Sequence, residues 1–193
     1  MIHAVLIFNT SGVPRLTKFY TPLRTPSQQL ISKIFSLVSS RSPTLCNFLD
    51  TPELNALLGD RIGDEVRVVY RCYATLYFVF VVDTSESELG ILDLIQVFVE
   101  SLDRSFENVC ELDLVFHFDD VHHILAEVIQ GGLVLETNVN EIAEAVHASS
   151  QARKQSFQSA NPLALGSGSG PRGSSLQAPI GWLTNRFTGV GSR

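Results

Sequence analysis

One stretch of the chain, residues 67–116, is almost entirely apolar or aromatic and changes its period midway. The part before Asp83 has the pattern of two paired strands, and the part after Ser85 has the pattern of a helix that is apolar on most sides. Elements with so little polar surface must be covered by the rest of the chain or by another protein. No arrangement of acids, bases or nucleophiles accompanies the stretch. The pattern favours a buried subunit of an assembly over a free enzyme.

Length and composition suit one folded domain followed by a tail. The chain has 193 residues, of which 45% are hydrophobic, and this is enough for a substantial core. The net charge of −6 argues against binding to nucleic acid or to an anionic membrane surface through bulk charge. We therefore expect no nucleic-acid partner, and no motif calls for a cofactor.

Three features indicate the cytosol. Residues 1–9 are apolar but lack the basic start and the cleavage site of a signal peptide, and they are more typical of a first strand. The longest apolar stretch, Leu76–Val82, is too short to cross a bilayer. Cys46, Cys72 and Cys110 lack metal-ligand spacing, and we interpret them as buried thiols in a reducing compartment. Any membrane contact is expected to be peripheral.

A hairpin and a helix are predicted at the start of the chain. Residues 2–9 and 14–20 have strand patterns, and the turn between them contains Gly12, which can take a positive φ. Thr25 can cap a helix that has Pro26 at its first position. Its apolar side chains share one face, so we expect the helix to lie on a sheet. They are Leu30, Ile31, Ile34, Leu37 and Val38.

A second hairpin is predicted over residues 66–73 and 75–83, after a short edge strand at 46–49 and a long loop at 51–64. The second strand of this hairpin is apolar at nearly every position, so strict alternation is lost. A strand of this kind is covered on both faces. We therefore expect helices on both sides of the sheet.

Helices dominate the remainder of the domain. Ser85 and Glu88 are spaced as a capping box for a helix that runs to about Phe106. Further helices are predicted over 109–129, ending before Gly131-Gly132, and from about Asn138.

The composition changes at about residue 150. Gln, Ser, Gly and Pro dominate from there, which predicts a domain over 1–149 and a flexible, disordered tail over 150–193. An apolar patch at 179–183 is either a short docking motif or, as we interpret it, an ordinary feature of such a tail.

Enzymatic readings find no support in the motifs. Asp119, His122 and His123 could share a helix face as a metal site, but adjacent side chains point about 100° apart on a helix. We therefore interpret them as a solvated face and expect no metal. The glycines at 166–170 follow no strand and have no lysine beside them, so they do not make a phosphate loop.

Three basic residues admit two readings. Arg15 and Lys18 lie on the second predicted strand, and Arg71 lies on the fourth. They serve either for solubility at strand ends, which composition alone favours, or as a small cationic spot beside an apolar groove. Such a spot would suit a peptide with an acidic residue near bulky aliphatic side chains.

Several long stretches occur in an order that is specific to one family. They are MIHAVLIFN (1–9), the segment 15–20, YRCYATLYFVFVVD (70–83) and FENVCELDLVF (106–116). They resemble the sigma (small) subunits of clathrin-adaptor-type complexes. The runs at 85–100 and 131–142 are similar to the branch from adaptor protein complex three. The resemblance covers residues 1–149, apart from the divergent loop at 51–64.

The resemblance implies a longin-like α/β (α+β) fold, with a five-stranded antiparallel sheet between one helix on one face and two or more on the other. It also implies a heterotetramer in which the chain packs directly on a large delta-type subunit, together with beta-type and medium subunits. Such a coat selects cargo at Golgi and endosomal membranes for the lysosome or vacuole, and it is recruited with an Arf-type GTPase.

The resemblance further implies a site for acidic dileucine signals, in which an acidic residue is followed three residues on by two aliphatic ones. By matching position, the aliphatic pockets are lined by Ala74, Leu76, Val99, Val109 and Leu114, with Tyr73 and Asn108 nearby. Arg15 would face the upstream polar or acidic residue, beside basic groups of the large subunit. Cys72 stands where some relatives have a second arginine, which alters the charge of this subsite.

Three alternatives are open at this point. One is a sigma chain of another adaptor complex. A second is a longin domain that regulates membrane fusion or GTPase exchange, although a fusion longin would need heptads after residue 150, where this chain has a Gly/Ser-rich segment. A third is a metal-dependent enzyme that uses the face at 119–123.

Overall fold

The computed structural model describes residues 1–23, 26–42, 45–50, 54 and 65–160. The chain divides into two compact units, Met1–Arg153 and Lys154–Arg193. The architecture below is that of the first unit.

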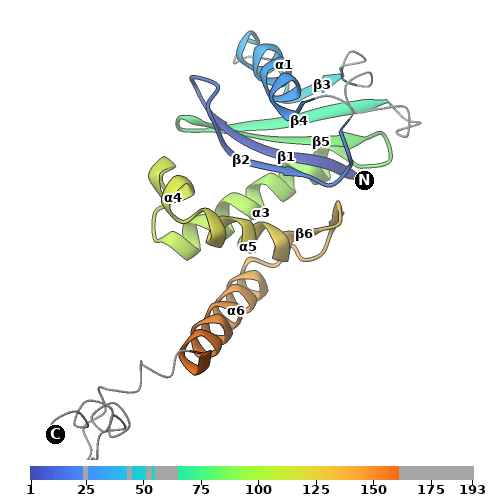
Figure 1. The fold of residues 1–193 in the computed structure, drawn as a ribbon. Helices are drawn as coiled ribbons and strands as arrows, with labels where there is room; N and C mark the ends of the chain where they lie inside the picture. The colour runs from blue at the N-terminus through green and yellow to red at the C-terminus, as the bar shows by residue number, and fades with distance from the viewer. Residues whose placement is uncertain (24–25, 43–44, 51–53, 55–64, 161–193) are drawn as a thin grey trace, which may run out of the picture. The chain divides into compact units, whose positions relative to one another are not determined.

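Five strands form one antiparallel sheet with the order β2-β1-β5-β4-β3 (Figure 1). The predicted hairpins are both present, and the predicted edge strand is shifted by two residues at its start. The five-stranded antiparallel sheet expected from the sequence is confirmed. The strands are β1 (Ile2–Asn9), β2 (Pro14–Phe19), β3 (Phe48–Asp50), β4 (Val66–Tyr73) and β5 (Leu76–Asp83).

Helices cover both faces of the sheet, as the loss of alternation in β5 predicts. Helix α1 (Ser27–Ser39) lies on one face, and α3 (Glu88–Phe106) and α5 (Phe118–Val128) lie on the other (Figure 1). Successive side chains of β5 enter two separate cores: Phe78 and Phe80 pack with α3 and α5, and Val79 packs with α1. The expected mixed architecture is therefore confirmed.

Helix α1 has the predicted amphipathic character. Leu30 and Ile34 are fully buried and face the sheet. Burial of such side chains stabilises the fold by about 1.5–3 kcal/mol each. Pro26 is the residue before the helix rather than its first residue, and the predicted cap Thr25 lies outside the described residues.

Helix α3 begins two residues later than the sequence predicts. Ser87 caps it by accepting a hydrogen bond from the Gly90 amide at 3.4 Å. Ser85, the predicted cap, instead donates to the Asp83 carboxylate and accepts from the N-terminal amine. The predicted capping box is therefore wrong, because Ser85 is held by a residue 84 positions away.

The helix predicted over 109–129 is two helices. Helix α4 (Glu111–Phe116) ends and α5 begins at His117, whose φ of −110° and ψ of 38° interrupt the helical path. The glycines that were expected to end this helix form a turn instead. They join β6 (Ile129–Gln130) to β7 (Leu133–Val134) in a second, two-stranded sheet.

The last helix, α6 (Val139–Ala160), starts where expected but is not short. It continues through 150–160, which the sequence analysis assigned to the tail. Residues 161–193 lie outside the described residues, so the disordered tail and its apolar patch remain predictions.

The three cysteines are exposed, contrary to the sequence-based interpretation. Cys72 follows Val68 and Tyr70 on the face of β4 that packs toward α1. It lies at the end of the strand, however, where that cover has ended. Cys110 is the residue before α4 and is exposed for the same reason, because it precedes the packed part of its element.

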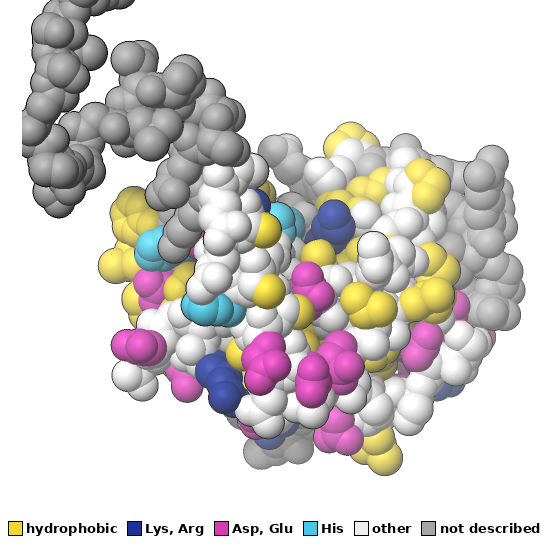
Figure 2. Space-filling view, turned by 90° about the horizontal axis from the view of Figure 1, so that it is seen from below, with side chains coloured by type: hydrophobic (Ala, Val, Ile, Leu, Met, Phe, Trp, Pro, Cys, Tyr) yellow, Lys and Arg dark blue, Asp and Glu magenta, His cyan; other side chains and the backbone are white. Residues whose placement is uncertain are grey.

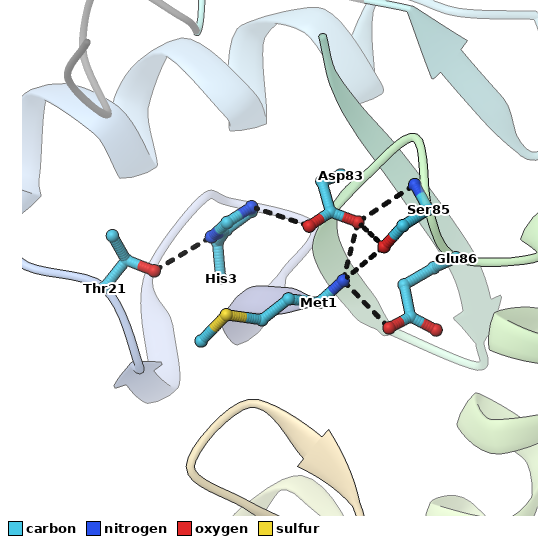
Figure 3. A network of polar contacts seen from close by, with 6 residues as sticks. All are labelled: Met1, His3, Thr21, Asp83, Ser85 and Glu86. Atoms are coloured by element: carbon cyan, nitrogen blue, oxygen red, sulfur yellow. Dashed lines mark hydrogen bonds and ion pairs between the residues drawn. The ribbon is translucent and has the colours of Figure 1, made fainter. Parts of the chain in front are cut away.

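An ionic network fixes the start of β1 beside the end of β5 (Figure 3). The Met1 amine lies 2.6 Å from Asp83 Oδ1 and 2.8 Å from Glu86 Oε1. Burial alone would raise the pKa of Asp83, but hydrogen bonds from the amine and from Ser85 hold this pKa below its ordinary value. The network therefore favours the charged forms of the Met1 amine and of the Asp83 carboxylate.

His3 is the buried neighbour of this network. Its side chain bonds Thr21 Oγ1 through Nδ1 at 2.8 Å, and its Nε2 lies 3.8 Å from Asp83 Oδ2 (Figure 3). Burial lowers the pKa of His3, and the Asp83 carboxylate offsets only part of this effect. The folded protein thus favours the neutral imidazole.

The first prediction concerns pH. In the unfolded state the pKa of His3 is about 6.5, and in the folded state it is lower. At a pH between these two pKa values the unfolded state therefore binds more protons than the folded state. The contribution of neutral His3 to the free energy of unfolding is therefore complete above the pKa of the unfolded state and is lost as the pH falls toward the pKa of the folded state. We expect the free energy of unfolding to fall less between about pH 7.5 and 5.5 in His3→Gln than in the wild type. Urea denaturation at several pH values measures this, and parallel curves would contradict it.

The second prediction uses the two turn glycines. Both have positive φ, but a Cβ at Gly131 would meet nothing within 4 Å, whereas one at Gly132 would collide with the Ile2 carbonyl oxygen and approach Met1 Cε to 2.9 Å. Gly131→Ala should therefore cost about 1–2 kcal/mol for its left-handed backbone. Gly132→Ala should cost clearly more. Equal losses in urea denaturation would show that the collision relaxes freely.

Candidate functional site

Most of the residues expected at the site gather at one end of the sheet, where two hairpin turns meet. Ala74, with a φ of 51°, lies in the turn between β4 and β5. Leu76 pairs with Asn9 at the end of β1, and the Thr10 amide donates to the Thr75 carbonyl at 3.1 Å. The β1–β2 and β4–β5 turns are thereby held against each other.

The loop between α3 and α4 reaches the same end. Glu107 and Asn108 both adopt left-handed backbone, with φ of 51° and 81°, which ends α3 and reverses the chain. The Val109 amide then donates to Asp103 Oδ1 at 3.1 Å. This turn leaves Asn108 exposed and Val109 half-buried against the core.

Arg15 connects β2 to α4 through Glu111, the first residue of that helix. Arg15 Nε and Nη2 lie 2.8 and 2.7 Å from the same oxygen, Glu111 Oε1. Asn9 Nδ2 donates to this oxygen as well, at 3.1 Å. The Arg15 guanidinium holds the pKa of Glu111 below its ordinary range. Arg15 is therefore half-buried and ion-paired, and is not a free cation at a strand end.

The expected pocket residues differ in how much surface they offer. Leu76 is 8% exposed and Leu114 is 1% exposed, so both belong to the core of this chain. Tyr73, Val99 and Val109 are half-buried and pack against the same core. The buried pair can thus form the floor of a site, whereas the three half-buried residues and Ala74 supply its accessible wall.

A network of polar side chains on β4 and α3 lies beside these residues. Tyr73 donates its hydroxyl to Gln96 Oε1 at 2.5 Å, and Arg71 Nη1 donates to the same oxygen at 3.2 Å. Gln96 Nε2 in turn donates to Glu100 Oε1 at 2.7 Å. Burial raises the pKa of Tyr73 above its ordinary value.

Two of these partners, Gln96 and Glu111, were not among the residues expected at the site. The sequence signal for Gln96 was its place in the polar stripe of an otherwise apolar helix. For Glu111 it was an acidic residue immediately before the apolar run Leu112–Phe116. Neither sequence pattern predicts which residue Gln96 or Glu111 contacts, because Arg15 and Arg71 lie on strands that are distant in the sequence.

Lys18, the third basic residue of the predicted cationic spot, does not lie with Arg15 and Arg71. Lys18 lies over the Tyr20 ring, with Nζ 5.9 Å from its centroid. The structure therefore brings Arg15 and Arg71 to the expected end of the sheet, whereas Lys18 contacts Tyr20, the residue that follows β2.

The face at 119–123 shows no sign of a metal site. Asp120 pairs with Arg153 at 3.2 Å, and the His122 ring packs on Phe118 with centroids 4.3 Å apart. Within residues 1–160, leaving aside the undescribed gaps, no group of three or more His, Cys, Asp or Glu side chains is placed to hold a metal ion. No helix of the described part is long and apolar enough to span a bilayer.

Large apolar side chains remain exposed beyond the site. Figure 2, which views the molecule from the side of α3 and α5, shows hydrophobic side chains at the surface among acidic ones. On α4 and the start of α5, Phe116 is 75% exposed, Leu112 62% and Phe118 51%. A second set lies on and after β7, where Leu133 is 63% exposed. We call the α4–α5 set, completed by Val115, the α4 apolar surface.

Comparison with known proteins gives consistent matches. A model of the family "Clathrin adaptor complex small chain" matches residues 1–153. The chain is 60% identical over 164 residues to the AP-3 complex subunit sigma of Schizosaccharomyces pombe, which covers 84% of this chain and 93% of the relative. It is 56% identical over 157 residues to the AP-3 complex subunit sigma-2 of Homo sapiens, covering 80% and 77% of the two chains.

The fold is shared with a chain of a full-length AP-3 complex, described as a homology model in a stretched open conformation. The TM-score is 0.61 at 47% sequence identity, and the match covers 82% of this chain and 99% of that one.

Proposed function

Since the chain belongs to the clathrin adaptor complex small chain family, we propose that it is the non-catalytic sigma subunit of an AP-3-type heterotetrameric vesicle coat. The observation that carries this proposal is the 60% identity to a sigma subunit of the AP-3 complex over 84% of the chain. The partners are a delta-type large subunit, which the chain contacts directly, and beta-type and medium subunits. The coat is a peripheral complex of Golgi and endosomal membranes, recruited with an Arf-type GTPase.

The α4 apolar surface supports a permanent partner. Leu112, Phe116 and Phe118 are each more than half exposed on adjoining elements. Contiguous apolar surface of this kind is rare on a protein that works alone, and is typical of obligate interfaces. We assign its cover to the large subunit.

The cluster at the end of the sheet supports the second part of the proposal, which is that this end binds acidic dileucine signals. Val99, Val109 and Tyr73 are half-buried and pack against the core that contains Leu76 and Leu114. Two buried leucine side chains contribute about 1.5–3 kcal/mol each before ordering costs are subtracted. The resulting weak, reversible affinity suits sorting, where many contacts to one membrane add avidity.

The third prediction tests assembly. Phe116→Ser should leave the chain folded, since this side chain is 75% exposed, but should reduce co-purification with the large subunit by at least about fivefold. Affinity capture from cells with quantitative mass spectrometry measures the loss and identifies which large subunit is present. Leu45→Ser, at an exposed leucine before β3, is the matched control. Undiminished recovery of a delta-type subunit, or recovery of another type of large subunit, would contradict the proposal.

The fourth prediction tests the signal site. Val99→Ser should weaken binding of a peptide with a Leu-Leu pair by about fivefold, because it removes part of the accessible aliphatic wall. The assembled complex is titrated with the labelled peptide by fluorescence polarisation, after equal subunit recovery has been verified. Leu45→Ser again serves as control. Equal affinity of both variants and the wild type would remove Val99 from the site.

A further inference from the structure

The Arg15 guanidinium is already occupied within the chain. Two of its N–H groups, on Nε and Nη2, point to Glu111 Oε1 at 2.8 and 2.7 Å. An arginine has five N–H donors, so three remain for another acceptor. The charge, however, is balanced: any acidic group that approaches Arg15 meets a neutral pair rather than a lone cation.

Several features hold the Glu111 carboxylate in this place and in its charged form. Asn9 donates to the same oxygen at 3.1 Å from the end of β1. Glu111 is also the first residue of α4, where backbone amides favour negative charge. Its pKa is held low, first by the hydrogen bond from Arg15. At neutral pH the carboxylate therefore does not leave by taking up a proton.

Arg71 offers an instructive contrast at the same end of the sheet. Its Nη1 donates at 3.2 Å to Gln96, a neutral amide, and its guanidinium stacks over Tyr73 at 5.3 Å. The structure thus places a carboxylate against one arginine of this end and an amide against the other. The family resemblance implies that Arg15 faces the signal's acidic residue, and Arg15 is the arginine with the internal carboxylate.

We propose that Glu111 is a specificity-determining residue, an internal carboxylate that competes with the acidic residue of the signal for Arg15. The proposal rests on the proposed signal-binding function. Two carboxylates around one guanidinium repel each other, so Glu111 reduces the advantage of an acidic residue over a neutral polar one. The site then selects mainly for the aliphatic pair and tolerates different residues upstream.

A double-mutant cycle on the assembled complex tests this. The probes are two synthetic peptides that share one Leu-Leu pair and differ only in having glutamate or glutamine at the upstream position. The measured quantity is the ratio of their affinities, obtained by fluorescence polarisation. In Glu111→Gln this ratio should shift about three- to tenfold in favour of the glutamate peptide, and the affinity for the glutamine peptide should change less than about twofold.

Glu88→Gln is the matched control. Glu88 is likewise the first residue of a helix and pairs with an arginine, Arg67 Nη1, at 3.0 Å. It lies eleven residues before Val99 on α3, or about 16 Å along the helix. The same charge is therefore removed from the same kind of position away from the site, and the affinity ratio should stay at the wild-type value.

Each outcome decides the question. A ratio in Glu111→Gln equal to or below the wild-type ratio overturns the role of Glu111, while leaving dileucine binding in place. Failure of both peptides to bind the wild type and Glu111→Gln overturns the proposed function and this inference with it. If Glu111→Gln does not co-purify with the large subunit, Glu111→Asp decides, because its shorter side chain should release Arg15 partially and shift the ratio in the same direction.

Discussion

Strand β5 is apolar on both faces, and the need to bury both faces determines where the helices must lie. Phe78 and Phe80 need cover on one side and Val79 and Val81 on the other, so α1 and the α3–α5 pair are separated by the sheet. Both faces are then occupied. Surface for binding remains at the ends of the sheet and on the outer sides of the helices. This arrangement leaves room for the signal site that we propose beside the β4–β5 turn and for the partner surface that we propose on α4.

The short helix α4 belongs to both of these proposed surfaces. It begins next to the sheet end, where Glu111 contacts Arg15, and it continues into residues that are exposed and apolar, such as Leu112 and Phe116. Its separation from α5 at His117 lets Leu114 enter the core while its neighbours face outward. A partner that covers the outer side of α4 therefore lies one helical turn from the residue that holds Arg15. In the proposed function, subunit assembly and signal recognition therefore share a single six-residue element.

Local sequence patterns predicted the strands of the sheet correctly. They gave wrong predictions where contacts with residues distant in the sequence determine the structure. Alternation and turn residues predicted both hairpins, because strand pairing there is between sequence neighbours. Ser85 looked like a helix cap but is held by the Met1 amine, and Ser87 takes its place. Cys72 was expected to be buried because its neighbours are apolar, yet cover ends before the strand does. The family resemblance predicts a set of pocket residues that does not include Glu111, because the contact of Glu111 with Arg15 depends on the approach of α4 to β2.

The central claim is that a signal is bound between the β4–β5 turn and the start of α4. Hydrogen-exchange mass spectrometry on the assembled complex, with and without a saturating dileucine peptide, tests it most directly. The account predicts added protection in segments 73–76 and 108–114 of this chain, with the α1 face unchanged. Saturation of the complex by peptide without added protection in either segment would contradict it.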